Sequence, residues 1–69
     1  MEVSARNQLP GRIAKLTLGT VMAEVTIDIG DGKTIVAAVT RGSAEQLVLA
    51  DGQAVVAVIK ATEVMIGTR

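Results

Sequence analysis

No aromatic residue, cysteine or histidine occurs in this chain, although 49% of its 69 residues are hydrophobic. The apolar side chains are those of Val, Ile, Leu, Ala and Met, which pack closely between strands but provide no bulky aromatic centre for a small core. A domain of this size buries proportionally little surface alone, and disulfides, a structural metal or self-association usually compensate. Because the residues that form disulfides and soft metal sites are missing, the sequence predicts association with further copies of the chain.

Charge and hydropathy argue against two classes of partner. Seven basic and seven acidic residues give a net charge of zero, so overall charge draws the chain neither to nucleic acid nor to an anionic membrane. Residues 1–7 contain no apolar stretch of a signal peptide, and no run approaches membrane-spanning length. We therefore expect a soluble cytoplasmic protein with no nucleic-acid or membrane partner, in which any anion site is local.

Short apolar runs separated by glycine and proline indicate strands. Val25, Ile27 and Ile29 alternate with polar residues, which is the period of a strand with one solvated face. The turn at residues 30–32 (GDG) supplies the positive φ angles of a tight hairpin. Residues 34–40 then read as the returning strand.

The flanking segments complete the expected secondary structure. Residues 9–18 indicate a longer first strand, interrupted at Pro10-Gly11. Residues 43–46 (SAEQ) fit a capping box, with Ser43 as the N-cap of one short helical turn. After a turn at Asp51-Gly52, residues 54–59 lack polar alternation, which predicts cover on both faces, the second by another subunit. Residues 64–66 (VMI) are expected to form the last strand.

Five strands, with one short helix between the third and the fourth, are typical of a small barrel of the oligonucleotide/oligosaccharide-binding type. The sequence therefore predicts an all-β fold, a five-stranded barrel of this type, in a single domain over residues 1–69.

Catalysis is not indicated by the polar residues. Without His or Cys there is no imidazole base, thiolate nucleophile or soft metal ligand. Asp31 and Asp51 occur in turn contexts, and Glu24 and Asp28 lie on the solvated face of a strand. We therefore expect no enzyme and no site for a free metal cation.

Hydrogen-bond donors gather near both ends of the chain. Ser4 and Arg6 point to the same side if their segment is extended, and Lys60 follows the most apolar strand. Ala61 and Thr62 are small enough for their main-chain amides to approach a ligand. Guanidinium, ammonium, hydroxyl and amide donors together suit a charged oxyanion. The residues alone nevertheless favour the simpler interpretation that Arg6 and Lys60 are surface charges flanking strands.

Two motifs near opposite ends of the chain carry a resemblance to a known family. Residues 4–9 (SARNQL) and 58–67 (VIKATEVMIG) resemble the molbindins. These are single-domain relatives of the TOBE domains appended to molybdate transport ATPases and molybdate-responsive repressors. The hairpin, the Val-Thr stretch before the short helix and the chain length are also similar.

The resemblance implies a five-stranded TOBE barrel and a homohexamer built as a trimer of dimers. It also implies that molybdate or tungstate binds at subunit interfaces, without a cofactor, for storage or buffering. Carried over residue by residue, the principal site has Ser4, Ala5, Arg6, Lys60 and Ala61 from one subunit, and Thr40 and Ser43 from a neighbour.

A second class of oxyanion site in the family draws on the segment that here reads Gly19, Thr20, Val21 and Met22. Family members often have Asn where this chain has Met22, whose thioether is only a weak acceptor. The main-chain amides of Thr20 and Val21 are then the expected donors. Pro10-Gly11, where Lys-Gly is common in the family, is expected to alter only surface charge.

Two other classes of function remain open from the sequence. Barrels of this type also bind single-stranded nucleic acid, but through stacked aromatic residues in a basic groove, which this chain lacks. The chain can instead be a structural or regulatory interaction module in which the donors have no ligand. Molybdopterin binding, historically attached to the family label, lacks an aromatic platform here.

Overall fold

The computed structural model describes residues 4–69. Within this range, four strands form a single sheet: β1 (Asn7–Leu18), β2 (Met22–Gly30), β3 (Lys33–Thr40) and β4 (Ala54–Ile59). Helix α1 (Arg41–Gln46) lies between β3 and β4, as expected, and the 3₁₀ turn η1 (Ala61–Glu63) follows β4. The fold is thus mostly β, with one short helix.

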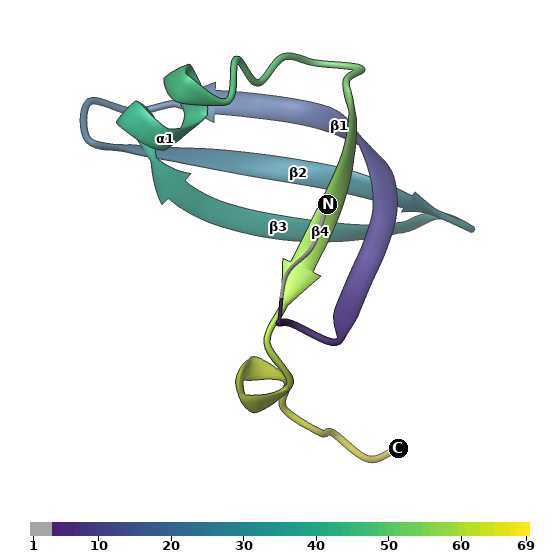
Figure 1. Cartoon of the computed structure of the whole chain (residues 1–69). Coiled ribbons are helices and arrows are strands. Elements are labelled where there is room, and N and C mark those ends of the chain that lie inside the picture. Colours follow the sequence, from purple (N-terminus) through teal and green to yellow (C-terminus); the bar gives the residue numbers. More distant parts are fainter. Residues whose placement is uncertain (1–3) are drawn as a thin grey trace.

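Strand β1 is shared by both halves of the sheet. The strand order is β3-β2-β1-β4, with all pairs antiparallel. The first half of β1 pairs with β4 and its second half with β2, and Arg12 is opposite a residue of each. The sheet therefore curls around β1, so that β4 crosses in front of β2 and β3 (Figure 1).

An irregularity at Ala14 sets the bend of β1. Ile13 is opposite Ile27 but Lys15 is opposite Thr26, so the intervening residue is extra, as in a β-bulge. The loop before β4 is fixed at this point. The Gly52 amide donates to the Ile13 carbonyl at 2.7 Å, and the Leu16 amide donates to the Asp51 carboxylate at 3.0 Å. The Asp51 carboxylate thus ties the turn before β4 to the bend of β1.

Replacing Asp51 with alanine is expected to lower the free energy of unfolding by about 1 kcal/mol, because the Leu16 amide loses a charged acceptor at a partly exposed position. Asp51→Asn keeps an acceptor oxygen and is expected to retain most of that stability. Urea unfolding of both variants, at equal protein concentration, measures the difference. Equal losses in the two variants would contradict the role assigned to the hydrogen bond.

The alternation predicted for residues 24–29 is confirmed. Val25 and Ile27 are buried with Ile13 and Ala57 in the main core cluster, while Glu24 and Asp28 are exposed. The predicted hairpin is also confirmed, since Gly30, Asp31 and Gly32 all have positive φ angles. Strand β4 has the bounds predicted for it.

Two predictions of local structure were wrong. Helix α1 begins after Thr40, whose side-chain oxygen accepts from the Ser43 amide, so Thr40 rather than Ser43 is the N-cap. Pro10-Gly11 does not interrupt β1, which pairs with β4 through both residues. Pairing with β2 starts only at Arg12, so the missing Pro10 amide faces a free strand edge, where proline is tolerated.

The expected fifth strand is not formed within residues 4–69. Residues 64–66 have no strand partner, because η1 carries the chain past the end of β4 and away from the sheet (Figure 1). Within the single chain one face of β4 is covered, since Val55 and Ala57 face inward while Val56 and Val58 are exposed. Cover of the second face by another subunit stays a prediction. The sheet is therefore an open, four-stranded part of the predicted barrel.

Candidate functional site

One group of predicted donors lies where β1 begins and β4 ends. Asn7 is opposite Ile59, so residues 4–6, which precede β1, emerge beside residues 60–61, which follow β4. The Gln8 side-chain amide donates to the Ala5 carbonyl at 3.1 Å, which fixes the path of the N-terminal segment. The structure thus brings together Ser4, Ala5, Arg6, Lys60 and Ala61, which we call the cationic group.

The cationic group has donors to offer. Neither Arg6 nor Lys60 forms an ion pair with a carboxylate among residues 4–69, and both are exposed. The hydrogen bonds of η1 begin with the Glu63 amide, which donates to the Lys60 carbonyl at 2.9 Å. The amides of Ala61 and Thr62 therefore lie outside that ladder, as first amides of a helical turn do.

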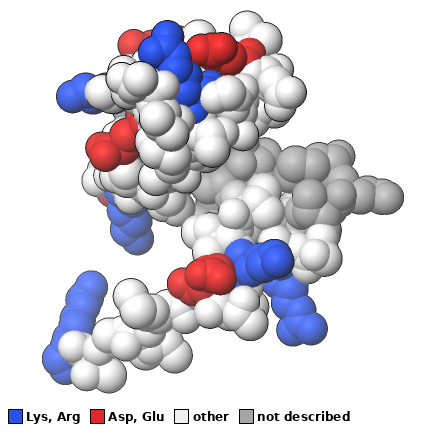
Figure 2. Space-filling view, turned by 90° about the vertical axis from the view of Figure 1, so that its left-hand side faces the viewer, with Lys and Arg blue, Asp and Glu red and all other residues white. Residues whose placement is uncertain are grey.

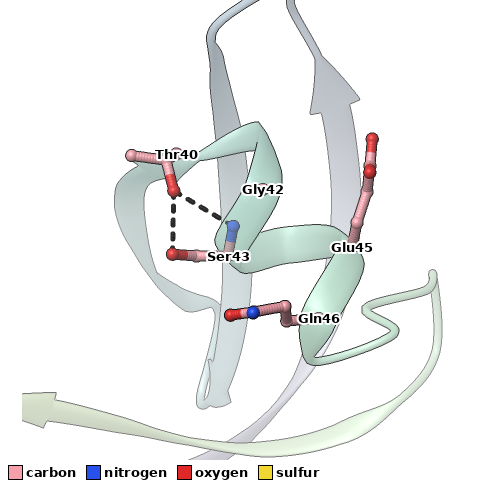
Figure 3. Close-up of a pocket in the computed structure, with 5 residues that line it drawn as sticks. All are labelled: Thr40, Gly42, Ser43, Glu45 and Gln46. Atoms are coloured by element: carbon pink, nitrogen blue, oxygen red, sulfur yellow. Dashed lines mark hydrogen bonds between the residues drawn. The ribbon is translucent and has the colours of Figure 1, made fainter.

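The remaining predicted residues of the principal site, Thr40 and Ser43, lie at the start of α1. They line a shallow, open depression together with Gly42, Glu45 and Gln46 (Figure 3). We call these five residues the helix-start depression. The depression has a volume of about 620 Å³ and lies open to solvent, so it offers one wall of a binding site rather than an enclosed pocket.

The two hydroxyls have different hydrogen-bonding roles. The Thr40 oxygen accepts from the Ser43 amide at 3.0 Å, and the Thr40 hydroxyl donates to the Ser43 oxygen at 2.8 Å (Figure 3). Both bonds use Thr40 to hold the start of α1. Since a serine hydroxyl that accepts still has its own hydrogen, Ser43 keeps a donor for a ligand.

Arg41 ties the start of α1 to the turn between β1 and β2. Its guanidinium donates to Glu45 at 2.8 Å and to the Gly19 carbonyl at 3.2 Å, and its amide donates to the Val21 carbonyl at 2.8 Å. The pairing with Arg41 offsets the charge of Glu45, the one carboxylate that lines the depression. The contacts of Arg41 with Gly19 and Val21 also place the predicted second site next to the helix-start depression.

In that turn, the Gly19 amide donates to the Met22 carbonyl at 2.7 Å and is therefore not available to a ligand. Hydrogen bonds from the Thr20 and Val21 amides do not occur within the described part of the chain. The exposed Met22 side chain has no charge or N–H group with which to hold an anion. Main-chain amides are thus the donors that this turn presents.

The cationic group and the helix-start depression lie at opposite ends of the molecule. In Figure 1, α1 is near the top, whereas η1 lies below the sheet. The seven residues of the predicted principal site are therefore divided between two places on one chain, and they can meet only if different copies supply them. Gly42 and Gln46 line the depression although neither was among the predicted site residues. Thr40 as the N-cap would have placed both on the short helix α1.

The face of the molecule drawn in Figure 2 shows no dominant charge. Basic and acidic side chains are interspersed over the upper part of the molecule in Figure 2. Among the described residues, no three acidic side chains gather closely enough to hold a metal cation. None of the helices formed by residues 4–69 is long and apolar enough to cross a membrane.

Comparisons with known proteins agree on one family. A family model described as "TOBE domain" matches residues 3–66. Molybdenum-pterin-binding protein 1 of Clostridium pasteurianum is 42% identical over 66 residues, which are 96% of this chain and 97% of that protein. A probable molybdenum-pterin-binding protein of Haemophilus influenzae is 43% identical over 67 residues, 97% of each chain.

Solved structures give the same result. MopII from Clostridium pasteurianum has a TM-score of 0.91 at 40% identity and covers 97% of this chain and 100% of its own. A molybdate-binding protein from Sporomusa ovata also scores 0.91, at 38% identity, covering 99% and 100%. These matches confirm the resemblance drawn from the two terminal motifs. The chain belongs to the TOBE domain family, as a member of the molbindin type.

Proposed function

We propose that residues 1–69 form one domain that binds molybdate or tungstate at interfaces between copies of the chain, in a homohexamer arranged as a trimer of dimers. The protein stores or buffers the oxyanion in the cytoplasm and catalyses no reaction. The names of the relatives from Clostridium pasteurianum and Sporomusa ovata support the ligand. A solved relative described as the cytoplasmic molybdate-binding protein ModG, with a TM-score of 0.83 at 49% identity, supports the location.

The division of the donors between two ends of the chain carries the proposal of a shared site. The cationic group supplies Arg6 and Lys60 without enclosing a ligand. The helix-start depression is open to solvent and has no free cation among its five lining residues. Neither group alone holds a charged anion away from water. Two copies placed with one group against the other would combine charge with hydroxyl donors.

The chemistry of the combined groups suits a tetrahedral dianion. At neutral pH, molybdate only accepts hydrogen bonds, and every group assigned to it here is a donor. Arg6 and Lys60 offset its charge, while the Ser43 hydroxyl and the amides of Ala61 and Gly42 fix its position. A site in which every group assigned to the anion is a donor disfavours protonated phosphate, and rigid donor spacing favours a large oxyanion over sulfate.

The turn at residues 19–22 is the proposed second site. Its exposed main-chain amides at Thr20 and Val21 suit an anion that is held near a symmetry axis, where equivalent turns from several copies meet. Arg41 holds this turn through the Gly19 and Val21 carbonyls, so the two classes of site are joined within each chain.

The printed names of the relatives include the word pterin. Pterin rings are flat and are usually held by stacking on aromatic side chains, and this chain has none. We therefore assign the oxyanion alone as the ligand.

Calorimetry with molybdate, tungstate, sulfate and a free pterin tests the ligand, and sedimentation equilibrium tests the assembly. We expect the two large oxyanions to bind to an oligomer, with sulfate far weaker and the pterin not bound. Absence of molybdate binding by the oligomer would overturn the storage proposal. A monomer that binds molybdate would overturn the interface site while leaving the ligand in place.

Thr40 and Ser43 are expected to respond differently to substitution. Thr40→Val removes the helix N-cap and should lower the free energy of unfolding by about 1 kcal/mol. Ser43→Ala leaves the Thr40 cap of the Ser43 amide in place and should instead weaken molybdate binding by about 1 kcal/mol, since one neutral donor is lost. Urea unfolding and calorimetry of both variants separate the effects. A Ser43→Ala variant of unchanged affinity would remove Ser43 from the site.

A further inference from the structure

Arg41 contacts the carbonyl side of the turn at residues 19–22. Its Nη1 atom donates to the Gly19 carbonyl at 3.2 Å, and its main-chain amide donates to the Val21 carbonyl at 2.8 Å. In Figure 1 this turn is the loop that joins β1 to β2, beside α1. One residue of α1 thus holds two carbonyls of the turn that is the proposed second oxyanion site.

The Gly19 carbonyl and the Thr20 amide belong to the same peptide group. The described peptide bonds are all trans, so the C=O and the N–H of this group point in opposite directions. Because Arg41 lies on the carbonyl side, the Thr20 N–H faces away from it. That amide donates no hydrogen bond within residues 4–69, and Thr20 is exposed. The amide side of the peptide is therefore open to a ligand.

The turn has no charge of its own with which to attract an anion. Residues 19–22 (GTVM) contain no charged side chain. A charged donor makes a stronger hydrogen bond to a carbonyl than a neutral one, and linked hydrogen bonds polarise one another. The bond from Arg41 to the Gly19 carbonyl therefore makes the Thr20 N–H a better donor. Its positive charge acts on an anion across the peptide group, without touching it.

A second hydrogen bond fixes the orientation of the guanidinium. Nε of Arg41 donates to the Glu45 carboxylate at 2.8 Å, while Nη1 donates to the Gly19 carbonyl. Two bonds from different nitrogens of one planar group determine how its plane lies. The side chains of Arg41 and Glu45 are 44% and 61% exposed, and so exposed an ion pair contributes little to stability. Its main consequence is to aim Nη1 at the turn.

We propose that Arg41 is a positioning residue of the second oxyanion site. It supplies the positive charge that the turn lacks, through the Gly19–Thr20 peptide, and it holds the turn so that the Thr20 amide faces the anion. This inference rests on the second site of the proposed function and names the source of its charge. The principal site has cations of its own, Arg6 and Lys60, and is expected to depend on Arg41 far less.

Nuclear magnetic resonance of the ¹⁵N-labelled full chain, titrated with molybdate, reports on the two sites separately. The Thr20 amide reports on the second site and the Ala61 amide on the principal site, and in the native protein we expect molybdate to shift both resonances. Arg41→Met removes the charge and the side-chain donors but keeps a long side chain. It should weaken binding at Thr20 about tenfold and at Ala61 by less than about threefold. The Thr20 resonance of the ligand-free variant should also differ from the native one.

Two further variants separate the charge of Arg41 from a merely structural role. Arg41→Lys keeps the charge and a donor for the Gly19 carbonyl, so binding at Thr20 should return to within about threefold of the native affinity. Lys33→Ala removes an exposed cation at the opposite end of β3 from Arg41 and should leave both affinities unchanged.

The titrations distinguish failure of this inference from failure of the proposed function. Native affinity at Thr20 in Arg41→Met would overturn the role of Arg41, and so would an Arg41→Lys variant that binds as weakly as Arg41→Met. If molybdate shifts Ala61 but not Thr20 in the native protein, the second site and this inference fail while the principal site stands. If it shifts neither, the proposed function fails as well.

Discussion

Replacing Arg6 with alanine is expected to weaken molybdate binding about a hundredfold, a loss of a few kcal/mol. Arg6 precedes β1 and Lys60 and Ala61 follow β4, so they lie at the same end of the sheet because Asn7 pairs with Ile59. At a subunit interface the Arg6 guanidinium would donate to the anion with little competition from water. A charge-assisted donor lost from such a site costs more than a neutral one. Calorimetric titration of the variant with molybdate measures the change.

Two control variants separate charge from geometry. Arg6→Lys keeps the positive charge but loses the planar fork of donors, so an intermediate affinity is expected. Lys33→Ala removes an exposed cation at the start of β3, outside both donor groups, and should leave the affinity unchanged. Native affinity in Arg6→Ala would remove Arg6 from the site, and an equal loss in Lys33→Ala would indicate a general effect of charge.

Replacing Gly11 with alanine is expected to lower the free energy of unfolding by about 2 to 3 kcal/mol. A Cβ atom at this position would lie 2.5 Å from the Asp28 carbonyl oxygen and 2.8 Å from a methyl carbon of Ile27. The closest obstacle is backbone, so β1 must move away from β2 where the sheet bends. Gly11 therefore matters for the packing of β1 against β2. The expectation that Pro10-Gly11, in place of Lys-Gly, alters only surface charge concerns position 10 and stays a prediction.

Gly42→Ala is the matched control for Gly11. A Cβ atom at Gly42 meets nothing within 4 Å, and the residue lies in α1. Alanine favours a helix over glycine, so this variant should be as stable as the native chain or slightly more stable. Urea midpoints of both variants, at the same protein concentration because the chain is expected to self-associate, test the contrast. Equal stability of Gly11→Ala and the native chain would contradict the close approach of β1 and β2.

Sequence patterns predicted those parts of the fold that depend only on residues adjacent in the chain. The alternation at Val25, Ile27 and Ile29 indicated β2, and the glycines at residues 30–32 indicated the hairpin, because strand period and positive φ angles depend on adjacent residues. The N-cap was misplaced by three residues, since Thr40 and Ser43 are both good caps and only the end of β3 selects between them. The need for Gly11 depends on a residue of another strand and has no local signal.

The fifth strand was predicted from residues that have strand character but no strand partner among residues 4–69. A strand is defined by pairing, and pairing is invisible to a pattern within one segment. The candidate site shows the same limit. Juxtaposition of residues 4–6 with residues 60–61 follows from the β1–β4 register, which composition does not contain. The family resemblance indicated that residues 4–6 and 60–61 belong to one site, and that Thr40 and Ser43 come from another copy.

The course of β1 has a consequence for the distance between the two proposed oxyanion sites. The strand begins at Asn7, beside the cationic group, and ends at Leu18, next to the turn that Arg41 holds. Twelve residues fully extended would span about 36 Å between the first and last Cα atoms, and the bend at Ala14 shortens that reach. The length and curvature of this one strand thus fix how far apart each chain holds its two ends, and in the proposed assembly they would also set the spacing between the two classes of oxyanion site.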